Sequence, residues 1–137
     1  MDDSTKVLQA NAAFYKAFSS KDLTLMESVW LHSDSVKCIH PGWHLIVGWQ
    51  DVSETWKTIF DSGGLFHAEA LDEEAYVIGD VAWVICTENL THKMRDEIVT
   101  GAAQTTNIYE RVGGVWLLTH HHASPAPSQA IREDLLQ

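Results

Sequence analysis

Basic residues, cysteines and long apolar runs are all scarce in this chain. Nine lysines and arginines stand against nineteen aspartates and glutamates, which gives a net charge of −10 at pH 7 with histidine neutral. Nucleic acids and anionic membranes attract positively charged surfaces, so this balance argues against both as partners. The chain lacks an apolar run near the ~20 residues of a membrane span, and its first residues lack the apolar core of a signal peptide. We therefore predict a cytoplasmic protein.

The two cysteines, Cys38 and Cys86, each lie within an apolar run. They are expected to be small buried side chains in a reducing compartment, because a chain of 137 residues needs no disulfide framework. Apolar residues make up 45% of the chain, enough for a globular core. We predict one domain over residues 1–137, with its core at about 6–125 and a tail at 126–137. Signatures of nucleotide-binding loops and of the nucleophile elbow are absent from the sequence.

Hydrophobic periodicity changes character near the middle of the chain. The first half has helical spacing and the second half has long β-rich runs. Predicted helices are residues 4–19, 23–30 and 49–61, with a weak helical pattern at 129–136. Predicted strands are residues 35–40, 43–47, 66–78, 81–93, 100–112 and 115–123. The two-residue Gly113-Gly114 turn indicates a hairpin between the last two strands.

Helices followed by an antiparallel meander indicate the α+β class. The strand at 81–93 carries apolar residues on both faces, with Trp83 and Ile85 on one and Val84 and Cys86 on the other. An antiparallel sheet with one open face alternates with polar residues instead. Both faces are therefore expected to be covered, one by the helices and the other by a second subunit in a homodimer.

Glu88 and Asn107 are polar residues within apolar strands. A carboxylate directed into an apolar interior has a raised pKa and can serve as an acid or a base, although Glu88 could also reach solvent at the end of its strand. Asparagine is disfavoured in the middle of a strand, so Asn107 is expected either to bond a ligand or to make a structural hydrogen bond.

The last strand contains three consecutive histidines. Because side chains alternate along a strand, His120 and His122 are predicted to share one face and to line the pocket, with His121 pointing away. One histidine of the pair is expected to bond a polar group, and the other to face the cavity or the partner subunit. A His-x-His pair can begin a metal site, and His40, His67, His92 or Glu88 could supply a third ligand, but the spacing selects none. We expect no metal and no other cofactor.

Six tryptophans are many for a chain of this length. Aromatic walls with a few convergent polar groups are typical of pockets for flat organic molecules, although buried aromatics also dominate ordinary cores. Trp43, beside the Pro41-Gly42 turn, and Trp56 are candidates for such a wall. Tyr15 lies off the main apolar stripe of the first helix and could turn its hydroxyl into the same space.

The order of these motifs resembles SnoaL-like proteins of the nuclear transport factor 2-like superfamily. The resemblance covers about residues 6–125 and rests on Cys-Ile-His-Pro-Gly at 38–42, Gly-Trp at 48–49, Thr-Asn-Ile-Tyr-Glu-Arg at 106–111 and the segment 114–124. It implies a cone in which a strongly curved sheet wraps the helices, with a deep pocket at the open end and a dimer across the sheet. The superfamily includes enzymes, binding proteins and assembly modules, so it implies no single function.

The ending at 120–127 is also similar to the association domain of calcium/calmodulin-dependent kinase II, which builds rings. That resemblance places pocket arginines at the positions of Glu88 and Asn107, so this chain lacks their positive charge. The polyketide cyclase and ketosteroid isomerase branches use an aspartate base, which has no secure counterpart here.

The sequence therefore predicts a homodimer that binds a small, partly apolar organic molecule. The predicted lining is Tyr15, His40, Trp43, Trp56, Glu88, Asn107, His120 and His122. If the chain is an enzyme, the expected chemistry is proton transfer on a carbonyl-containing ligand, with Glu88 or a pocket histidine as base. The alternative is an association module without catalysis.

Overall fold

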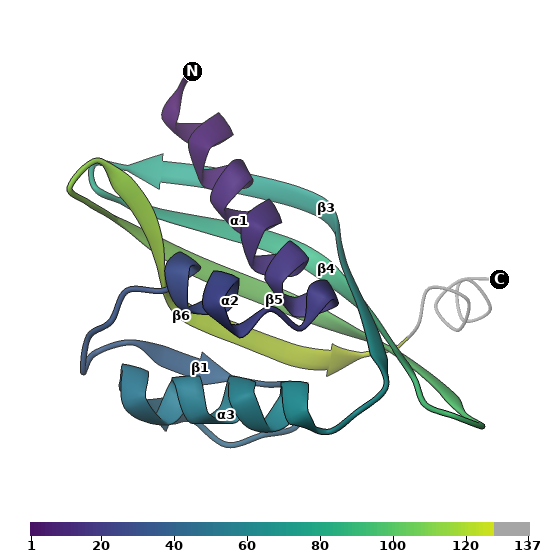
Figure 1. Cartoon of the computed structure of the whole chain (residues 1–137). Coiled ribbons are helices and arrows are strands. Elements are labelled where there is room, and N and C mark those ends of the chain that lie inside the picture. Colours follow the sequence, from purple (N-terminus) through teal and green to yellow (C-terminus); the bar gives the residue numbers. More distant parts are fainter. Residues whose placement is uncertain (128–137) are drawn as a thin grey trace, which may run out of the picture.

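The computed structural model describes residues 1–127, which form three helices and a six-stranded sheet (Figure 1). The helices are α1 (Asp3–Ser20), α2 (Leu23–Val29) and α3 (Trp49–Asp61). The strands are β1 (Lys37–Ile39), β2 (Ile46–Val47), β3 (Leu65–Ile78), β4 (Val81–Lys93), β5 (Ile98–Val112) and β6 (Val115–Ala126). Figure 1 shows the helices on one side of a curved sheet, with α1 crossing the long strands and α3 beside β1. The predicted α+β cone is confirmed.

The sheet has the strand order β2-β1-β6-β5-β4-β3. Strands β3 to β6 form the predicted antiparallel meander, and β1 extends the sheet by pairing in parallel with β6. Gly113 and Gly114 form the predicted turn with φ values of 58° and 81°, the left-handed conformation that a two-residue turn of this type requires. The addition of β1 to β6 brings the Cys38 region beside the three histidines.

Local sequence accounts for the helix boundaries. The Asp2 side chain caps α1 by accepting a hydrogen bond from the Thr5 backbone N–H, and Asp22 caps α2 in the same way through Leu25. Lys21 between them has a φ of 54°, which ends α1. The predicted strand at 43–47 is shorter because a turn joins the Trp43 N–H to the His40 carbonyl. The predicted helix at 129–136 lies outside the described residues.

Two bulges change which residues of the strands face the helices. In β3 the register shifts between Leu71 and Glu74, and in β5–β6 it shifts so that Ile108 pairs with His120 while Tyr109 pairs with Leu118. Thr119 is therefore one residue extra on β6. Because side chains alternate with a period of two, one extra residue exchanges the faces of every residue after it.

Aromatic side chains fill the space between the helices and the sheet. Phe14 and Phe18 of α1 meet Trp56 of α3 edge to face, with ring centroids 5.6 and 5.1 Å apart. Edge-to-face pairs contribute about 0.5–1.5 kcal/mol each beyond the area that they bury. These contacts fix α1 against α3 and form the wall around the polar residues described below.

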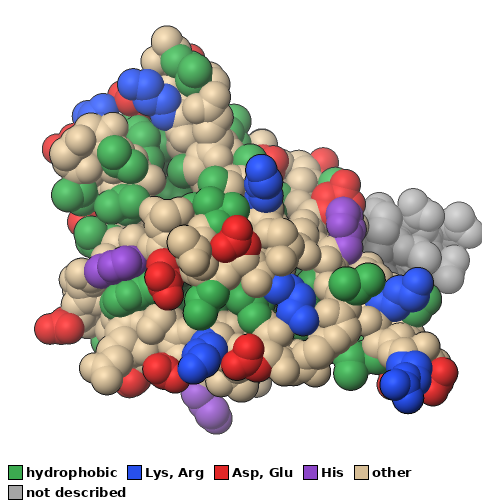
Figure 2. All heavy atoms as spheres, viewed as in Figure 1, with side chains coloured by type: hydrophobic (Ala, Val, Ile, Leu, Met, Phe, Trp, Pro, Cys, Tyr) green, Lys and Arg blue, Asp and Glu red, His purple; other side chains and the backbone are tan. Residues whose placement is uncertain are grey.

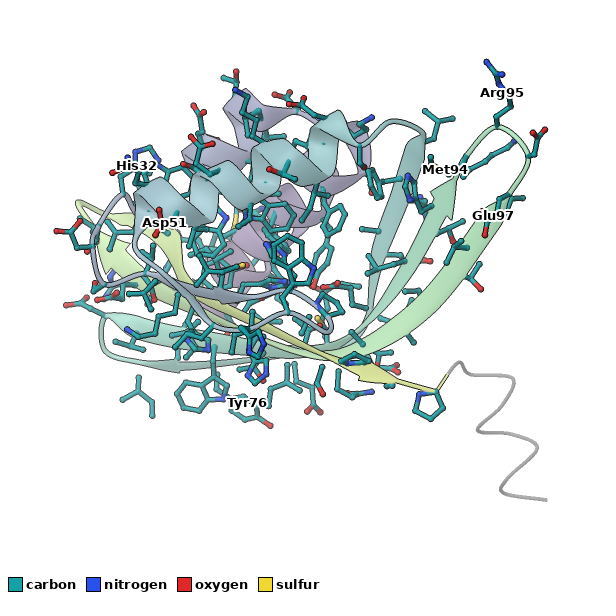
Figure 3. All side chains as sticks on the ribbon, turned by 90° about the horizontal axis from the view of Figure 1, so that it is seen from below. His32, Asp51, Tyr76, Met94, Arg95 and Glu97 are labelled. Atoms are coloured by element: carbon teal, nitrogen blue, oxygen red, sulfur yellow. The ribbon has the colours of Figure 1, made fainter. Side chains whose placement is uncertain are left out.

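The opposite face of the sheet is open and partly apolar. Figure 3 shows Tyr76 pointing away from the helices. The Tyr76 ring stacks on Trp83 at 5.6 Å, while Tyr76 is 48% exposed and Ile85 is 41% exposed. The predicted partner subunit would lie on this face. On the helix side, Figure 2 shows acidic and basic side chains interspersed over the surface. None of the helices within residues 1–127 is long and apolar enough to cross a bilayer.

Candidate functional site

Polar side chains gather in the interior between α1 and the sheet. Asn11 and Tyr15 lie one turn apart on the face of α1 that packs on the sheet, and they meet residues from three neighbouring strands. The buried polar members are Asn11, Tyr15, His40, Glu88, Thr105, Asn107 and His121, and none is more than 5% exposed. Buried polar groups normally occur with hydrogen-bond partners. Buried polar atoms that lack a hydrogen-bond partner are therefore candidates for contact with a ligand.

Glu88 lies on the inner face of β4 and is fully buried. Its oxygen Oε2 accepts hydrogen bonds from the Tyr15 hydroxyl at 2.7 Å and the Thr105 hydroxyl at 3.3 Å. Its second oxygen, Oε1, has no protein partner within residues 1–127. Burial raises the pKa of Glu88 to about 6, partly offset by the two hydrogen bonds. The structure thus places Glu88 inward, which is one of the two positions that the sequence left open.

Asn107 links the strands to α1. Its Nδ2 donates to Asn11 Oδ1 at 2.9 Å, and the Tyr109 hydroxyl donates to the same oxygen at 2.7 Å. Asn107 Oδ1 lies 2.6 Å from His121 Nδ1. Asn107 thus makes the structural hydrogen bonds that formed one of its two predicted roles, and a ligand contact stays a prediction.

His121 is the inward histidine of β6. It is fully buried, whereas His120 is half-buried and His122 is exposed. The predicted pair does share a face, with ring centroids 6.3 Å apart, but it is the face away from the helices. The predicted orientation is wrong because the extra residue Thr119 exchanges the two faces just before the histidines.

His40 is buried at the end of β1 beside the aromatic wall. Its Nε2 lies 2.9 Å from the Thr55 hydroxyl, and its ring meets Trp56 edge to face at 4.7 Å. Burial lowers the pKa of His40 to about 4. Trp43 is 45% exposed and packs against the outer side of His40 at 4.9 Å. The pocket wall at Trp56 and the rim at Trp43 stay predictions.

His121 Nε2 and Trp56 Nε1 are, with Glu88 Oε1, buried atoms left without a hydrogen-bond partner in the described chain. The His121 and Trp56 rings are 6.1 Å apart. Burial, reinforced by the neighbouring histidines, lowers the pKa of His121 well below its usual range, so the ring is neutral. The indole nitrogens of Trp30 and Trp116 are also buried without a partner among the described residues, so the orphaned atoms are Glu88 Oε1, His121 Nε2 and three indole donors, of which Trp56 lies beside His121.

An apolar depression of about 240 Å³ lies farther along α1 and β4. Phe18 and Leu90 contribute to its lining; Phe18 packs on Trp56, and Leu90 is two residues from Glu88 on the same strand. The remaining lining residues are Phe66, Thr91, His92, Val99, Thr100 and Gly101. A second groove of about 350 Å³ lies between α1, α2 and the β5–β6 turn and is lined mainly by small and aliphatic side chains. Glu88 and the other buried polar side chains line neither depression.

Metal ligation finds no support in the arrangement of the described side chains. Across residues 1–127, His, Cys, Asp and Glu do not form a group of three that could hold an ion. Cys38 and Cys86 are buried free thiols, as predicted, and burial raises the pKa of Cys86 to about 11. Neither thiol is activated as a nucleophile by this environment.

Three members of the cluster, Asn11, Thr105 and His121, were not predicted as site residues from the sequence, and neither was Tyr109, which bonds to Asn11. Asn11 had a detectable signal, because it interrupts the apolar stripe that Val7, Phe14 and Phe18 form along α1. Thr105 is two residues from Asn107 on the same strand and therefore shares its face. His121 had no local signal, because its orientation depends on a bulge.

Comparison with known proteins identifies the family. Residues 7–128 match the sequence model of the SnoaL-like domain. The fold is similar to that of a candidate dehydratase of the NTF2-like family from Streptomyces avermitilis, with 31% identity, a TM-score of 0.85 and coverage of 92% of this chain and 97% of the other. It is also similar to a candidate calcium/calmodulin-dependent protein kinase type II association domain from Thiobacillus denitrificans, with 33% identity, a TM-score of 0.75 and coverage of 86% and 93%.

A curated relative, the F-box protein SKIP8 of Arabidopsis thaliana, is 30% identical over 118 residues, which are 86% of this chain. The chain spans about half of that protein's length, 48%. The family match extends over most of the sequence and agrees with the fold. The chain belongs to the SnoaL-like domain family, as the sequence motifs predicted.

Proposed function

We propose that this SnoaL-like domain binds a small uncharged organic molecule inside its cone and transfers a proton on it through Glu88. The observation that carries the proposal is the free oxygen Oε1 of Glu88, which is buried without a partner among the described residues. A buried carboxylate oxygen without a hydrogen bond is costly, and such groups cluster at functional sites. A ligand that donates a hydrogen bond to Oε1 removes that cost.

The pKa of Glu88, raised to about 6, suits both directions of proton transfer near neutral pH. In its ionised form the carboxylate removes a proton from the carbon next to a ligand carbonyl, and the C–H electron pair passes into an enolate. The protonated carboxyl then returns the proton. Return to a different carbon of a conjugated enolate gives an isomerisation with a shifted double bond. Return to a departing hydroxyl group gives loss of water and a new carbon–carbon double bond.

The free atoms favour a particular class of ligand. Glu88 Oε1 and His121 Nε2 are acceptors when the carboxylate is ionised, and both suit hydroxyl groups of a ligand. Trp56 Nε1 is a donor and suits a carbonyl oxygen. An anionic ligand would face the Glu88 carboxylate, and the positions of the arginines in the kinase association domain hold Glu88 and Asn107 here. We therefore favour an uncharged hydroxy-carbonyl compound with an apolar part for the depression at Phe18.

The comparison with the Streptomyces protein supports loss of water as the reaction, rather than isomerisation. That protein is named as a candidate dehydratase, and the two chains are 31% identical over nearly their full lengths. Loss of water next to a carbonyl needs one group that removes and returns a proton. Glu88 can supply that group in this chain.

The test is a thermal-shift screen of uncharged hydroxy-carbonyl compounds, followed by turnover assays on the hits. A ligand that binds the folded state raises Tm by mass action, with about 2.7 kcal/mol of stabilisation at a hundred times Kd. Glu88→Gln preserves the side-chain shape but cannot accept a proton, so we expect turnover to fall at least ~100-fold. Glu54→Gln, at an exposed site on α3, is the matched control and should leave turnover unchanged. Equal turnover in the wild type and Glu88→Gln would reject the proposal.

A second candidate function is self-association. The exposed apolar residues on the outer face of the sheet favour it, and so does 33% identity to an association domain from Thiobacillus denitrificans. We propose a homodimer that buries this face. A dimer is compatible with a ligand site inside each cone, whereas a larger ring would favour the association module.

A further inference from the structure

A chain of side-chain hydrogen bonds connects the surface of β3 to the buried His121. Glu73 Oε2 accepts from Asn11 Nδ2 at 2.7 Å, and Asn11 Oδ1 accepts from Asn107 Nδ2 at 2.9 Å. Asn107 Oδ1 then lies 2.6 Å from His121 Nδ1. Asn11, Asn107 and His121 are fully buried, but Glu73 is exposed at the bulge of β3. A surface carboxylate is thus joined to a buried imidazole through two amides.

The orientation of one amide in this series of hydrogen bonds determines the orientation of the next, because each amide has an acceptor oxygen and a donor NH₂ group on opposite sides. An ionised carboxylate only accepts, so Asn11 turns its NH₂ group towards Glu73 and its oxygen inwards. Asn107 must then turn its NH₂ group towards Asn11 and its oxygen towards His121. An oxygen acceptor at Nδ1 requires a proton on that nitrogen. The neutral His121 ring therefore carries its proton on Nδ1.

The reverse direction is less favourable for the buried members. Asn11 would then donate from its NH₂ group to the Tyr109 oxygen and to Asn107 Oδ1. Asn107 would donate to His121 Nδ1, and the ring proton would lie on Nε2. The Tyr109 hydroxyl proton would lose its acceptor, Asn11 Oδ1, and Asn107 would turn its oxygen towards the Tyr15 hydroxyl, whose proton goes to Glu88. At the exposed end, the oxygen of Asn11 would face the Glu73 carboxylate across a hydrogen-bond distance, so Glu73 opposes the reverse direction as well.

We propose that Glu73 is a positioning residue that, together with the buried Tyr15 and Tyr109 hydroxyls, fixes the Nδ1–H tautomer of His121 and so presents the Nε2 lone pair inside the cone. Nε2 has no other partner in the described part of the protein, residues 1–127. It is an acceptor for a hydroxyl or N–H group of a ligand. The tautomer assignment stands on the hydrogen-bond chain alone, whereas the ligand contact rests on the proposed function.

The experiment is ¹⁵N NMR of histidine-labelled protein at pH 7, because the two ring nitrogens have different shifts in the two tautomers. The His121 signals are identified by their loss in His121→Gln. We expect the Nδ1–H form in the wild type. In Glu73→Lys the carboxylate is replaced by a group that only donates, so the Nε2–H form should gain population. Glu73→Arg is a second donor-only variant at the same exposed position.

Glu74→Lys is the matched control, since it changes the same charge at the next, also exposed, residue and should leave the tautomer unchanged. A wild-type protein in the Nε2–H form would overturn the proposal. So would Glu73→Lys and Glu73→Arg proteins whose His121 spectra equal that of Glu74→Lys. For any ligand found in the screen, Glu73→Lys should weaken binding up to about tenfold, the effect of one lost hydrogen bond. If Glu73→Lys changes the tautomer but the screen finds no ligand, the role of the hydrogen-bond chain is established. That result would then count only against the proposed function.

Discussion

Burial controls the protonation of the residues inside the cone. It raises the pKa of Glu88 to about 6 and lowers that of His40 to about 4, in each case favouring the neutral form. Between these two values the carboxyl and the imidazole are both mostly neutral. The hydrogen bonds from Tyr15 and Thr105 oppose the shift at Glu88 without cancelling it. The interior is therefore suited to uncharged ligands and to proton exchange near neutrality.

Glu88→Gln should change how stability depends on pH. Burial raises the folded-state pKa of Glu88 above its ordinary value of 4.5, so the native state holds this proton more tightly than the unfolded state does. The resulting stabilisation is present below about pH 4.5 and is lost as the pH rises to about 6, a change of about 2 kcal/mol. Glutamine does not titrate. The stability of Glu88→Gln relative to the wild type should therefore rise by about 2 kcal/mol between pH 4 and pH 7.

Urea unfolding at several pH values measures this difference. The titration of His40 and His121 contributes to both proteins and cancels in the comparison. Glu54→Gln, at an exposed position, should show a difference near zero throughout. Parallel pH profiles for the wild type and Glu88→Gln would contradict the assigned burial effect.

At the scale of the elements, turns and bulges determine which side chains of each strand face the helices. The Gly113-Gly114 turn sets the register of β5 against β6, and the bulge at Thr119 then reverses the faces of the residues that follow. His121 consequently lies among the buried groups while His122 lies outside. The second bulge, in β3, brings Glu73 to the end of the hydrogen-bond chain. Both bulges have this effect because side chains alternate between the two faces of a strand, so one extra residue exchanges the faces.

Gly114→Ala should destabilise the protein by about 1 kcal/mol, because a Cβ atom disfavours the left-handed conformation that this residue adopts. The φ of Gly114 is 81°, and a Cβ added there would meet no atom within 4 Å in the described structure, so the cost is conformational. Gly101 is the matched control, because its position is equally open but its φ is not positive. Chemical denaturation should show Gly101→Ala neutral or slightly stabilising. Equal effects of the two substitutions would show that the turn conformation is not the cause.

At the scale of the whole molecule, the sheet separates a filled inner face from an open outer one. The helices cover the inner face, and Tyr76 points away from them on the other side (Figure 3). Tyr76 leaves an apolar surface there together with Trp83, on which it stacks, and the exposed Ile85. Contiguous exposed apolar residues mark interaction surfaces in soluble proteins. A second copy would bury the same residues from both chains in an isologous interface.

Analytical ultracentrifugation should show a dimer for the wild type and a monomer for Ile85→Glu, because the substitution places an unpaired charge in the proposed interface. Leu45→Glu, at a 53% exposed site between β1 and β2, should remain dimeric. Each copy carries a net charge of −10, so salt should strengthen association by screening repulsion. A monomeric wild type would exclude the dimer, and a larger ring would favour the association module.

Much of this architecture could be predicted from local sequence. The helix α3 and the strand β4 have the predicted bounds, and most other elements differ by one to three residues at their ends. Caps at Asp2 and Asp22, the Gly113-Gly114 turn and the two hydrophobic periods are short-range signals, so they are legible in a single chain. The inward position was one of the two predicted for Glu88 for the same reason, since this residue lies within an apolar alternation.

The sequence by itself thus determined the elements, the α+β class and the family, because each depends on residues close together in the chain, whereas the structure selected the inward one of two positions left open for Glu88. Only the tertiary structure decided which histidine faces inward, since one extra residue in β6 reverses the alternation. It alone also joined Glu73 to His121, because Asn11 and Asn107 meet across 96 positions of sequence. Contacts of that separation follow from how the helix lies on the sheet, which local periodicity does not encode.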